Sequence, residues 1–256
     1  MKNSDGNNES RNNEPAVEIQ NLCKSFGRQK VLNGIGLAVA RSETVVVLGR
    51  SGTGKSVLLK LLIGLQKPDS GSVRIQGQEI TGLKFKELNQ IRIKIGFLFQ
   101  QAALYDSLNI EENVAFPLDR HSNLQSAERK DRVRALLETV GMEQHRKKLP
   151  SQISGGMQKR VGLARALALE PELMLFDEPT AGLDPITAGE INQLILGLQE
   201  KRKITSIVVT HDIRGARTVS HRLVLLNEGS IAAQGTFAEL KNNQNPFVAQ
   251  FLSGDS

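Results

Sequence analysis

Eight consecutive residues have the types and spacing of a phosphate-binding loop. They are, in order, Gly49, Arg50, Ser51, Gly52, Thr53, Gly54, Lys55 and Ser56. Glycines allow successive backbone N–H groups to point into one concavity, and a helix that begins there adds the positive end of its dipole. In such a loop Lys55 contacts the β- and γ-phosphates of a nucleotide, and the Ser56 hydroxyl binds Mg²⁺. The sequence therefore predicts a P-loop at residues 49–56.

The sequence on either side of the loop supports this interpretation. An apolar run at residues 44–48 comes directly before it, and Val57, Leu58, Leu61 and Leu62 follow at helical spacing. A P-loop requires a strand before it and a helix after it, whereas an ordinary glycine-rich turn requires neither. We therefore expect the loop to join a buried strand to the first turn of a helix.

A second apolar run, residues 173–178, ends in two carboxylates, Asp177 and Glu178. Beside a P-loop, Asp177 is placed to hold Mg²⁺ together with Ser56. Glu178 is then a candidate general base for a water that attacks a γ-phosphate. Adjacent acids at the end of an apolar strand seldom have a structural role once a P-loop is present.

Two more apolar runs end in polar residues. Gln100 follows residues 93–99, and His211 follows residues 205–210. Ligands of α/β sheets bind outside the carboxyl ends of the strands, so we expect both side chains on the same rim as Asp177. Taken alone, Gln100 could equally close its strand, and a lone histidine is more often structural than catalytic.

Two other features are ambiguous when taken alone. Phe26 precedes a glycine at a turn, where a core role is the simpler interpretation, although a flat ring there could stack on a purine. Ser154, Gly155 and Gly156 open a predicted helix that extends to Leu169. Ser154 is a natural N-cap, and the glycine amides offer a second anion site. Because small residues are common at helix starts, this second signal is weak by itself.

The elements that must position these residues alternate along the chain. We expect strands at residues 17–22, 37–40, 44–48, 93–99, 173–178 and 205–210, hairpins at 72–77 and 223–233, and helices at 57–64, 126–140, 154–169, 186–200 and 237–252. Ser126 would cap its helix, and Pro246 would interrupt the last one. Residues 102–118 are apolar but irregular, which fits a docking surface or a satellite core. Residues 145–148 indicate a solvated basic loop. This order predicts an α/β fold.

Composition limits the class of protein. The 256 residues suffice for one large domain or two small ones, and 39% hydrophobic with 23% charged residues indicates a globular chain. The net charge is +6, but the 33 basic residues are scattered among 27 acidic ones. The charge therefore does not by itself indicate nucleic-acid binding. Cys23 is the single cysteine, which excludes a disulfide framework within the chain. Residues 1–14 are rich in asparagine and charge, and we expect them to be disordered.

Together these residues resemble the ATP-binding subunit of ABC transporters, over residues 15–252. The correspondence is motif by motif: Phe26 with the adenine-stacking aromatic, residues 49–56 with Walker A, Gln100 with the Q-loop, residues 153–157 with the signature, residues 173–178 with Walker B, Asp184 with the D-loop and His211 with the switch histidine. The resemblance implies a P-loop NTPase fold with a RecA-like core, an antiparallel β subdomain and a helical subdomain at about residues 101–165.

The resemblance also implies a mechanism. Two copies would meet head to tail, with each ATP between the P-loop of one copy and residues 154–156 of the other. Ser56, Gln100 and Asp177 would hold Mg²⁺, Glu178 would polarise the attacking water, and His211 would hold the γ-phosphate. A helix of a membrane subunit would dock near residues 100–117, at the cytoplasmic face of the inner membrane.

Met157 departs from the glutamine usual at the end of the signature. With the sequences at residues 111–118, 184–187 and 245–252, it resembles the Mla type, which powers bacterial phospholipid trafficking. That type implies an MlaE-like permease, an MCE-domain (MlaD-like) lipid-binding protein and, in some members, a STAS-domain protein as partners.

Three alternatives remain open. The ATPase of a small-solute importer, for amino acids for example, would have the same nucleotide site. A soluble ABC ATPase without a membrane partner, as in DNA repair or cluster assembly, is a second alternative. The repair kind would need a long coiled-coil insertion, and no sustained heptads occur between Gln100 and Ser154. A nucleotide sensor without hydrolysis is disfavoured by the intact Glu178 and His211. No nucleic-acid partner is expected.

Overall fold

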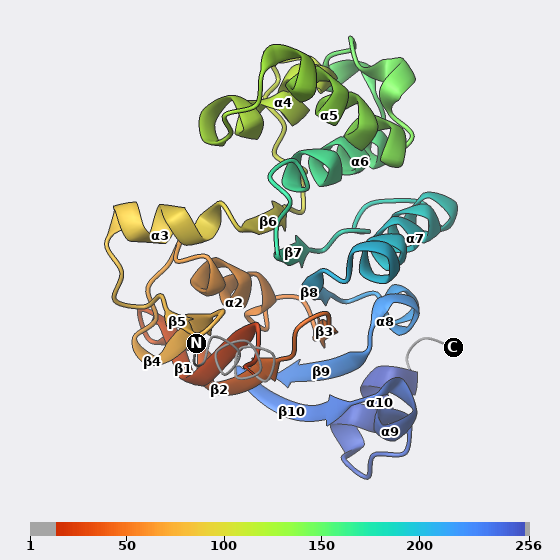
Figure 1. The fold of residues 1–256 in the computed structure, drawn as a ribbon. Coiled ribbons are helices and arrows are strands. Elements are labelled where there is room, and N and C mark those ends of the chain that lie inside the picture. The colour runs from red at the N-terminus through yellow and green to blue at the C-terminus, as the bar shows by residue number, and fades with distance from the viewer. Residues whose placement is uncertain (1–13, 254–256) are drawn as a thin grey trace, which may run out of the picture.

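A computed structural model describes residues 14–253, which form two β-sheets with helices around them (Figure 1). Residues 1–13 of the predicted disordered tail lie outside the described residues. The larger sheet has six strands in the order β10-β9-β3-β8-β7-β6. They are β6 (Ile95–Leu98), β7 (Leu173–Asp177), β8 (Thr205–Thr210), β3 (Thr44–Leu48), β9 (Arg222–Asn227) and β10 (Ser230–Gly235). All neighbours in it are parallel except β9 and β10, which form the predicted hairpin.

The register of the central strands aligns their carboxyl ends. Leu48 of β3 pairs with Thr210 of β8, and Asp177 of β7 pairs with Val209 of β8. The residues that follow directly are Gly49, His211 and Glu178. Parallel pairing therefore brings three separate sequence motifs to one edge of the sheet.

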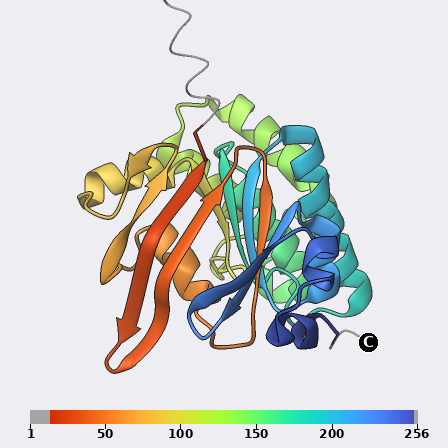
Figure 2. The same ribbon diagram turned by 90° about the horizontal axis from the view of Figure 1, so that it is seen from below.

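The smaller sheet is antiparallel, in the order β2-β1-β4-β5. Its strands are β1 (Val17–Phe26), β2 (Gln29–Val39), β4 (Ser70–Ile75) and β5 (Gln78–Glu79). Their inward side chains form one core with α2 (Lys55–Leu62) and with the facing side of β3 and β8. Figure 2 shows this sheet from below. The core holds the P-loop helix between the two sheets.

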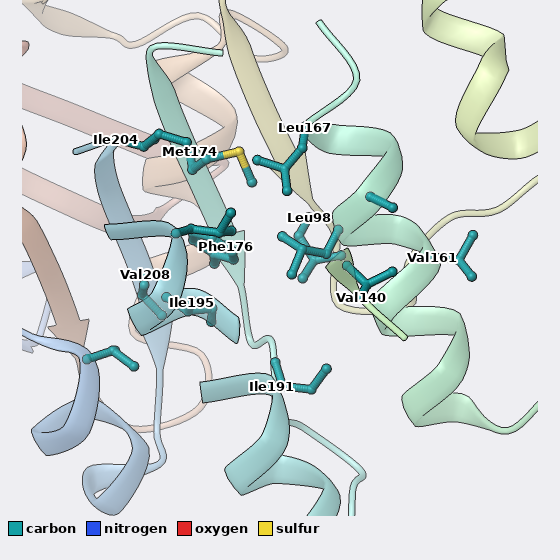
Figure 3. Close-up of a cluster of buried hydrophobic side chains, with 14 of the residues drawn as sticks. Leu98, Val140, Val161, Leu167, Met174, Phe176, Ile191, Ile195, Ile204 and Val208 are labelled. Carbon is teal, nitrogen blue, oxygen red and sulfur yellow. The ribbon is translucent and has the colours of Figure 1, made fainter. Parts of the chain in front are cut away.

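The remaining helices cover the large sheet and extend beyond it. Figure 1 shows α4 (Ile110–His121), α5 (Ser126–Thr139) and α6 (Gly155–Ala166) as one group above the sheet, followed by α7 (Pro185–Arg202), α8 (Ile213–Val219), α9 (Phe237–Lys241) and α10 (Pro246–Ser253). The cluster in Figure 3 joins α6 and α7 to the sheet through Leu98, Phe176, Leu167 and Ile195. The boundaries of a helical subdomain, about residues 101–165, stay a prediction. None of the helices within residues 14–253 is both long and apolar enough to cross a membrane.

Residues 110–121 form a regular helix, α4, within the stretch for which no element was predicted. The side chain of Asn109 accepts a hydrogen bond from the backbone N–H of Glu112, which caps the helix. Pro117 lies inside α4 and obscured the helical pattern. The loop at residues 145–148 is largely exposed, as predicted, and two of its carbonyls also accept the backbone N–H groups of Ile110 and Glu111.

The structure differs from the sequence prediction at two further places. A short helix, α3 (Phe85–Arg92), lies between β5 and β6 and was not predicted. Ser126 is the first residue of α5 and not its cap. The N-cap is Gln125, whose backbone N–H donates to the carboxylate of Glu128 at 2.9 Å.

Candidate active site

The P-loop has the backbone geometry that its glycines predict. Gly54 is the N-cap of α2 with a φ of 97°, a left-handed value that favours glycine. A Cβ on Gly54 would lie 2.9 Å from the side chains of Val31 and Leu32. No side chain caps α2, so its first N–H groups are left for an anion. The loop therefore offers a phosphate-binding concavity at the carboxyl end of β3.

Lys55 folds back over this loop. Its Nζ donates to the carbonyl of Gly49 at 2.8 Å and to that of Arg50 at 3.1 Å, and it lies 3.4 Å from Oε1 of Glu178. The residue is only 5% exposed. An ammonium group with little water around it interacts strongly with charge brought next to it. Lys55 is therefore placed to bind a phosphate that enters the loop.

Ser56 and Asp177 meet across the site as predicted. The Ser56 hydroxyl donates to Oδ1 of Asp177 at 2.7 Å, although 121 positions separate them in the sequence. Burial raises the pKa of Asp177, while the hydrogen bond from Ser56 acts in the opposite direction. A hydroxyl and a buried carboxylate, both oxygen donors, suit Mg²⁺, whose positive charge would favour the ionised carboxylate. These two residues fit the expected ion.

Glu178 is held by hydrogen bonds on one carboxylate oxygen. Its Oε2 accepts from the Thr210 hydroxyl at 3.1 Å, from the His211 backbone N–H at 3.3 Å and from His211 Nδ1 at 2.9 Å. The other oxygen faces Lys55. The residue is 8% exposed, whereas the imidazole of His211 is largely exposed. The arrangement suits a general base oriented by a histidine, with the rest of the imidazole open to a ligand.

Replacing His211 with alanine should lower kcat for ATP about 100-fold. Glu178 would lose its hydrogen bond to the imidazole, and the γ-phosphate would lose the expected contact with the same ring. Steady-state ATPase assays at saturating ATP measure this directly. His121→Ala, which removes an exposed imidazole at the end of α4, is the control and should retain wild-type turnover. Equal rates for the two variants would contradict the role given to His211.

The second predicted anion site lies at the start of α6. Ser154 caps the helix by accepting from the backbone N–H of Met157 at 3.3 Å. A Cβ on Gly155 would meet nothing within 4 Å, but one on Gly156 would lie 2.4 Å from Cγ2 of Thr187 in α7. Gly155 therefore faces open space, while Gly156 permits close packing of α6 on α7. The start of α6 thus packs on α7, whereas the P-loop site lies at the ends of β3, β7 and β8.

Asp184 caps α7 beside that packing contact. Its Oδ1 accepts from the backbone N–H groups of Ile186 at 3.1 Å and Thr187 at 3.0 Å. Hydrogen bonds from the Thr187 side chain and backbone lower the pKa of Asp184, which keeps it ionised. The D-loop residue thus fixes the first turn of the helix on which Gly156 packs.

Phe26 and Gln100 lie at the surface. Phe26 is the last residue of β1 and is 46% exposed, with Lys24 Nζ 5.4 Å from its ring centroid. Gln100 is exposed two residues beyond β6, and Arg50 and Ser51 are exposed in the loop. Their exposure is compatible with contact to a nucleotide. The roles given to these four residues stay predictions.

Sequence patterns missed three residues that support the site. Thr210 donates to Glu178, Lys159 donates to the backbone carbonyl of Glu178 at 3.0 Å, and Arg165 donates to the carbonyls of Ala102 and Ala103, both at 2.7 Å. Burial lowers the pKa of Arg165 and of Lys159. Neither basic residue interrupts a hydrophobic pattern or belongs to a recognisable motif. Thr210 alone carried a signal, as the last residue of a strand next to His211.

Comparisons with known proteins agree with this geometry. The family model described as "ABC transporter" matches residues 32–181. The probable ribonucleotide transport ATP-binding protein mkl of Mycobacterium leprae is 43% identical over 239 residues, which cover 93% of this chain and 69% of that protein. The methionine import ATP-binding protein MetN of Brucella abortus is 39% identical, covering 93% of this chain and 64% of MetN.

Solved structures match in the same way. The dimeric post-hydrolysis state of the ATP-binding cassette MJ0796, bound to ADP and Pi, superposes with a TM-score of 0.80 at 36% identity, covering 86% of this chain and 98% of that one. The structure of cbiO1 from Clostridium perfringens gives a TM-score of 0.81 at 29% identity, covering 94% and 99%. These matches confirm the predicted ABC ATPase fold and show that the chain binds ATP, with Mg²⁺ as the usual ion. The chain is an ATP-hydrolysing protein and belongs to the ATP-binding subunits of ABC transporters.

Proposed function

We propose that this chain binds ATP between two of its own copies and uses hydrolysis to drive membrane permease subunits. The observation that carries the proposal is the cluster at the ends of β3, β7 and β8, where Glu178 lies between Lys55 and His211. Beside this cluster, Ser56 and Asp177 would hold Mg²⁺. The ion would neutralise part of the phosphate charge. Glu178 is then placed to accept the proton of the attacking water.

The placement of the two anion sites supports a homodimer. The chain has one P-loop and one Ser154-Gly155-Gly156 element, and these rest on different supporting elements. A second copy placed head to tail would complete each pocket. The dimeric structure of MJ0796 bound to ADP and Pi supports this arrangement. Loss of the γ-phosphate would remove the bridge between the copies and allow them to part.

Within that dimer, each predicted site residue has a role. Residues 49–56 and Phe26 would hold the triphosphate and the adenine, while Gln100 would join Ser56 and Asp177 at Mg²⁺. Ser154, Gly155 and Gly156 would hold the γ-phosphate bound by the other copy, with Asp184 fixing the helix behind them. The nucleotide would thus lie at the interface, where its hydrolysis changes how tightly the copies bind.

An apolar hollow of about 390 Å³ is the proposed docking site for the permease. It lies between β6 and α4 and is lined by Ile93, Phe97, Phe99, Tyr105, Phe116 and Pro117, among others. Tyr105 is 45% exposed, and its ring centroid lies 4.5 Å from that of Phe116. Exposed aromatic clusters of this kind are typical of protein interfaces. The hollow suits the apolar face of a helix from a membrane subunit.

The hollow predicts a variant that separates hydrolysis from transport. Phe116→Asp should reduce binding to the permease at least 10-fold, because the new carboxylate would lose its water when the permease covers the hollow. The ATPase activity of the free subunit should stay within twofold of the wild type. Co-purification and steady-state ATPase assays measure the two effects. Phe85→Asp, at a residue that is 73% exposed on α3, is the control and should bind normally. Unchanged permease binding by Phe116→Asp would exclude the hollow.

The proposed cargo is phospholipid, and the chain itself would act at the cytoplasmic face of the inner membrane. Met157 and the sequences at residues 111–118, 184–187 and 245–252, which resemble the Mla type, support this proposal. The expected partners are an MlaE-like permease, an MCE-domain (MlaD-like) protein and, in some assemblies of this type, a STAS-domain protein. Cargo is selected by those chains, so the support comes from family resemblance and not from the nucleotide site.

Purification of the native complex tests the cargo. A copurified MCE-domain protein and phospholipid, identified by mass spectrometry, would support lipid transport. A periplasmic solute-binding protein would instead support the second candidate, a small-solute importer, which the similarity to the methionine import protein MetN favours. Recovery without any membrane protein would indicate an ABC ATPase that works alone.

A further inference from the structure

Lys159 is a buried cation that hydrolysis, as described above, does not use. It lies in the second turn of α6 and is 4% exposed. Lysine is seldom so buried, because removing an ammonium group from water is costly unless it finds partners. Its Nζ donates to the backbone carbonyl of Glu178 at 3.0 Å. The partner is therefore the peptide of the proposed base and not its carboxylate.

The backbone of Glu178 has a conformation that needs such support. Its φ is 47°, in the left-handed region that residues with a Cβ rarely adopt. The peptide N–H donates to Val209 of β8 at 2.9 Å, and the carbonyl accepts from Lys159 and from the backbone N–H of Ala181 at 3.2 Å. This conformation directs the carboxylate toward Lys55 and His211. A residue that holds the carbonyl therefore helps to set the direction of the carboxylate.

Lys159 also belongs to the helix that begins at Ser154. Five residues, little more than one helical turn, separate it from that cap, so the two move together on α6. Burial lowers the pKa of Lys159, while the negative charges of Asp177 and Glu178 act in the opposite direction. The lysine thus joins the start of α6 to the end of β7 through a single side chain.

We propose that Lys159 is a positioning residue, which connects the start of α6 to the base Glu178 of the same chain. The inference rests on the proposed dimer for its consequence: the start of α6 would contact ATP in one pocket, and Glu178 would act in the other. If nucleotide binding in the first pocket shifts α6, the carbonyl of Glu178 would move with it. The direction of the Glu178 carboxylate in the second pocket would then change. Lys159 would link the two pockets within each copy.

Three variants of the full chain, assayed with its membrane subunits, test the proposal. Lys159→Met keeps the aliphatic stem and removes the donor. It should lower kcat for ATP at least 10-fold while KM stays within twofold, because the nucleotide-binding loops are untouched. Lys159→Gln keeps an N–H donor on a side chain one bond shorter, and its kcat should lie at least threefold below the wild type and clearly above that of Lys159→Met. Arg160→Met removes the neighbouring cation, which bonds Glu190 and Val140, and should leave kcat unchanged.

Wild-type kcat in Lys159→Met, or equal losses in kcat and in apparent ATP affinity, would overturn the proposal. If thermal unfolding shows that Lys159→Met is not folded, Lys159→Gln decides: a wild-type kcat, or loss of the fold in this variant too, counts against a positioning role. Failure of the dimer is a separate result. It would appear as a Glu178→Gln variant that stays monomeric with ATP, whereas the effect of Lys159 on its own chain could still be measured.

Discussion

Glu178→Gln should abolish ATP turnover and hold the protein as an ATP-bound dimer. The amide keeps the shape of the side chain but cannot take a proton from water, so kcat should fall by a factor on the order of 1,000. ATP binding should be retained, because Lys55, Ser56 and Asp177 are unchanged. Phosphate release measures turnover, and size-exclusion chromatography with light scattering at saturating ATP measures the dimer.

The matched control for this variant is Glu172→Gln. It makes the same change in an exposed glutamate just before the other end of β7, and both turnover and oligomeric state should match the wild type. Hydrolysis by Glu178→Gln at the normal rate would show that another group is the base. A monomer at saturating ATP, with the membrane partners supplied, would rule out the proposed dimer.

Lys55→Met should weaken ATP binding by a factor on the order of 100, with a matching loss of activity at low ATP concentration. The ammonium group is nearly buried and would form charge-assisted hydrogen bonds with phosphate oxygens, which a thioether cannot replace. Equilibrium binding of a fluorescent ATP analogue measures the change.

Lys86→Met, in an exposed part of α3, is the control for charge and should bind the analogue normally. The folded state of Lys55→Met should be checked by thermal unfolding, because the change also removes the cation 3.4 Å from Glu178. Normal affinity in a folded Lys55→Met would show that the backbone of the loop alone holds the phosphates.

The grouping of the candidate site residues could be predicted because these residues follow strand ends. Apolar runs mark β3, β7 and β8, and Gly49, Glu178 and His211 come directly after them. Parallel pairing then requires that these residues share one edge, even though 162 positions separate Gly49 from His211. The sequence pattern thus contains both the strands and the residues that they bring together.

Other features depend on contacts that no local pattern records. Helix α4 was not predicted, because Pro117 lies inside it and the cap at Asn109 that supports it is visible only in the structure. Lys159 and Arg165 act through carbonyl groups of distant segments, and a backbone carbonyl has no sequence signal. The Gly156 contact with Thr187 is likewise a consequence of how α6 packs on α7. Long-range packing determined each of these features.

Because the strand ends are aligned, the protein should tolerate insertions and deletions at one edge of the large sheet better than at the other. Because side chains alternate between the two faces of a strand, one inserted or deleted residue in β7 would turn Asp177 to the other face and move Glu178 out of its left-handed position. No linker separates either carboxylate from its strand, so nothing could absorb the change. At the opposite edge of the sheet, longer turns would leave the carboxylates undisturbed. Evolution of this scaffold should therefore add segments away from the ATP-binding edge and conserve strand length next to it.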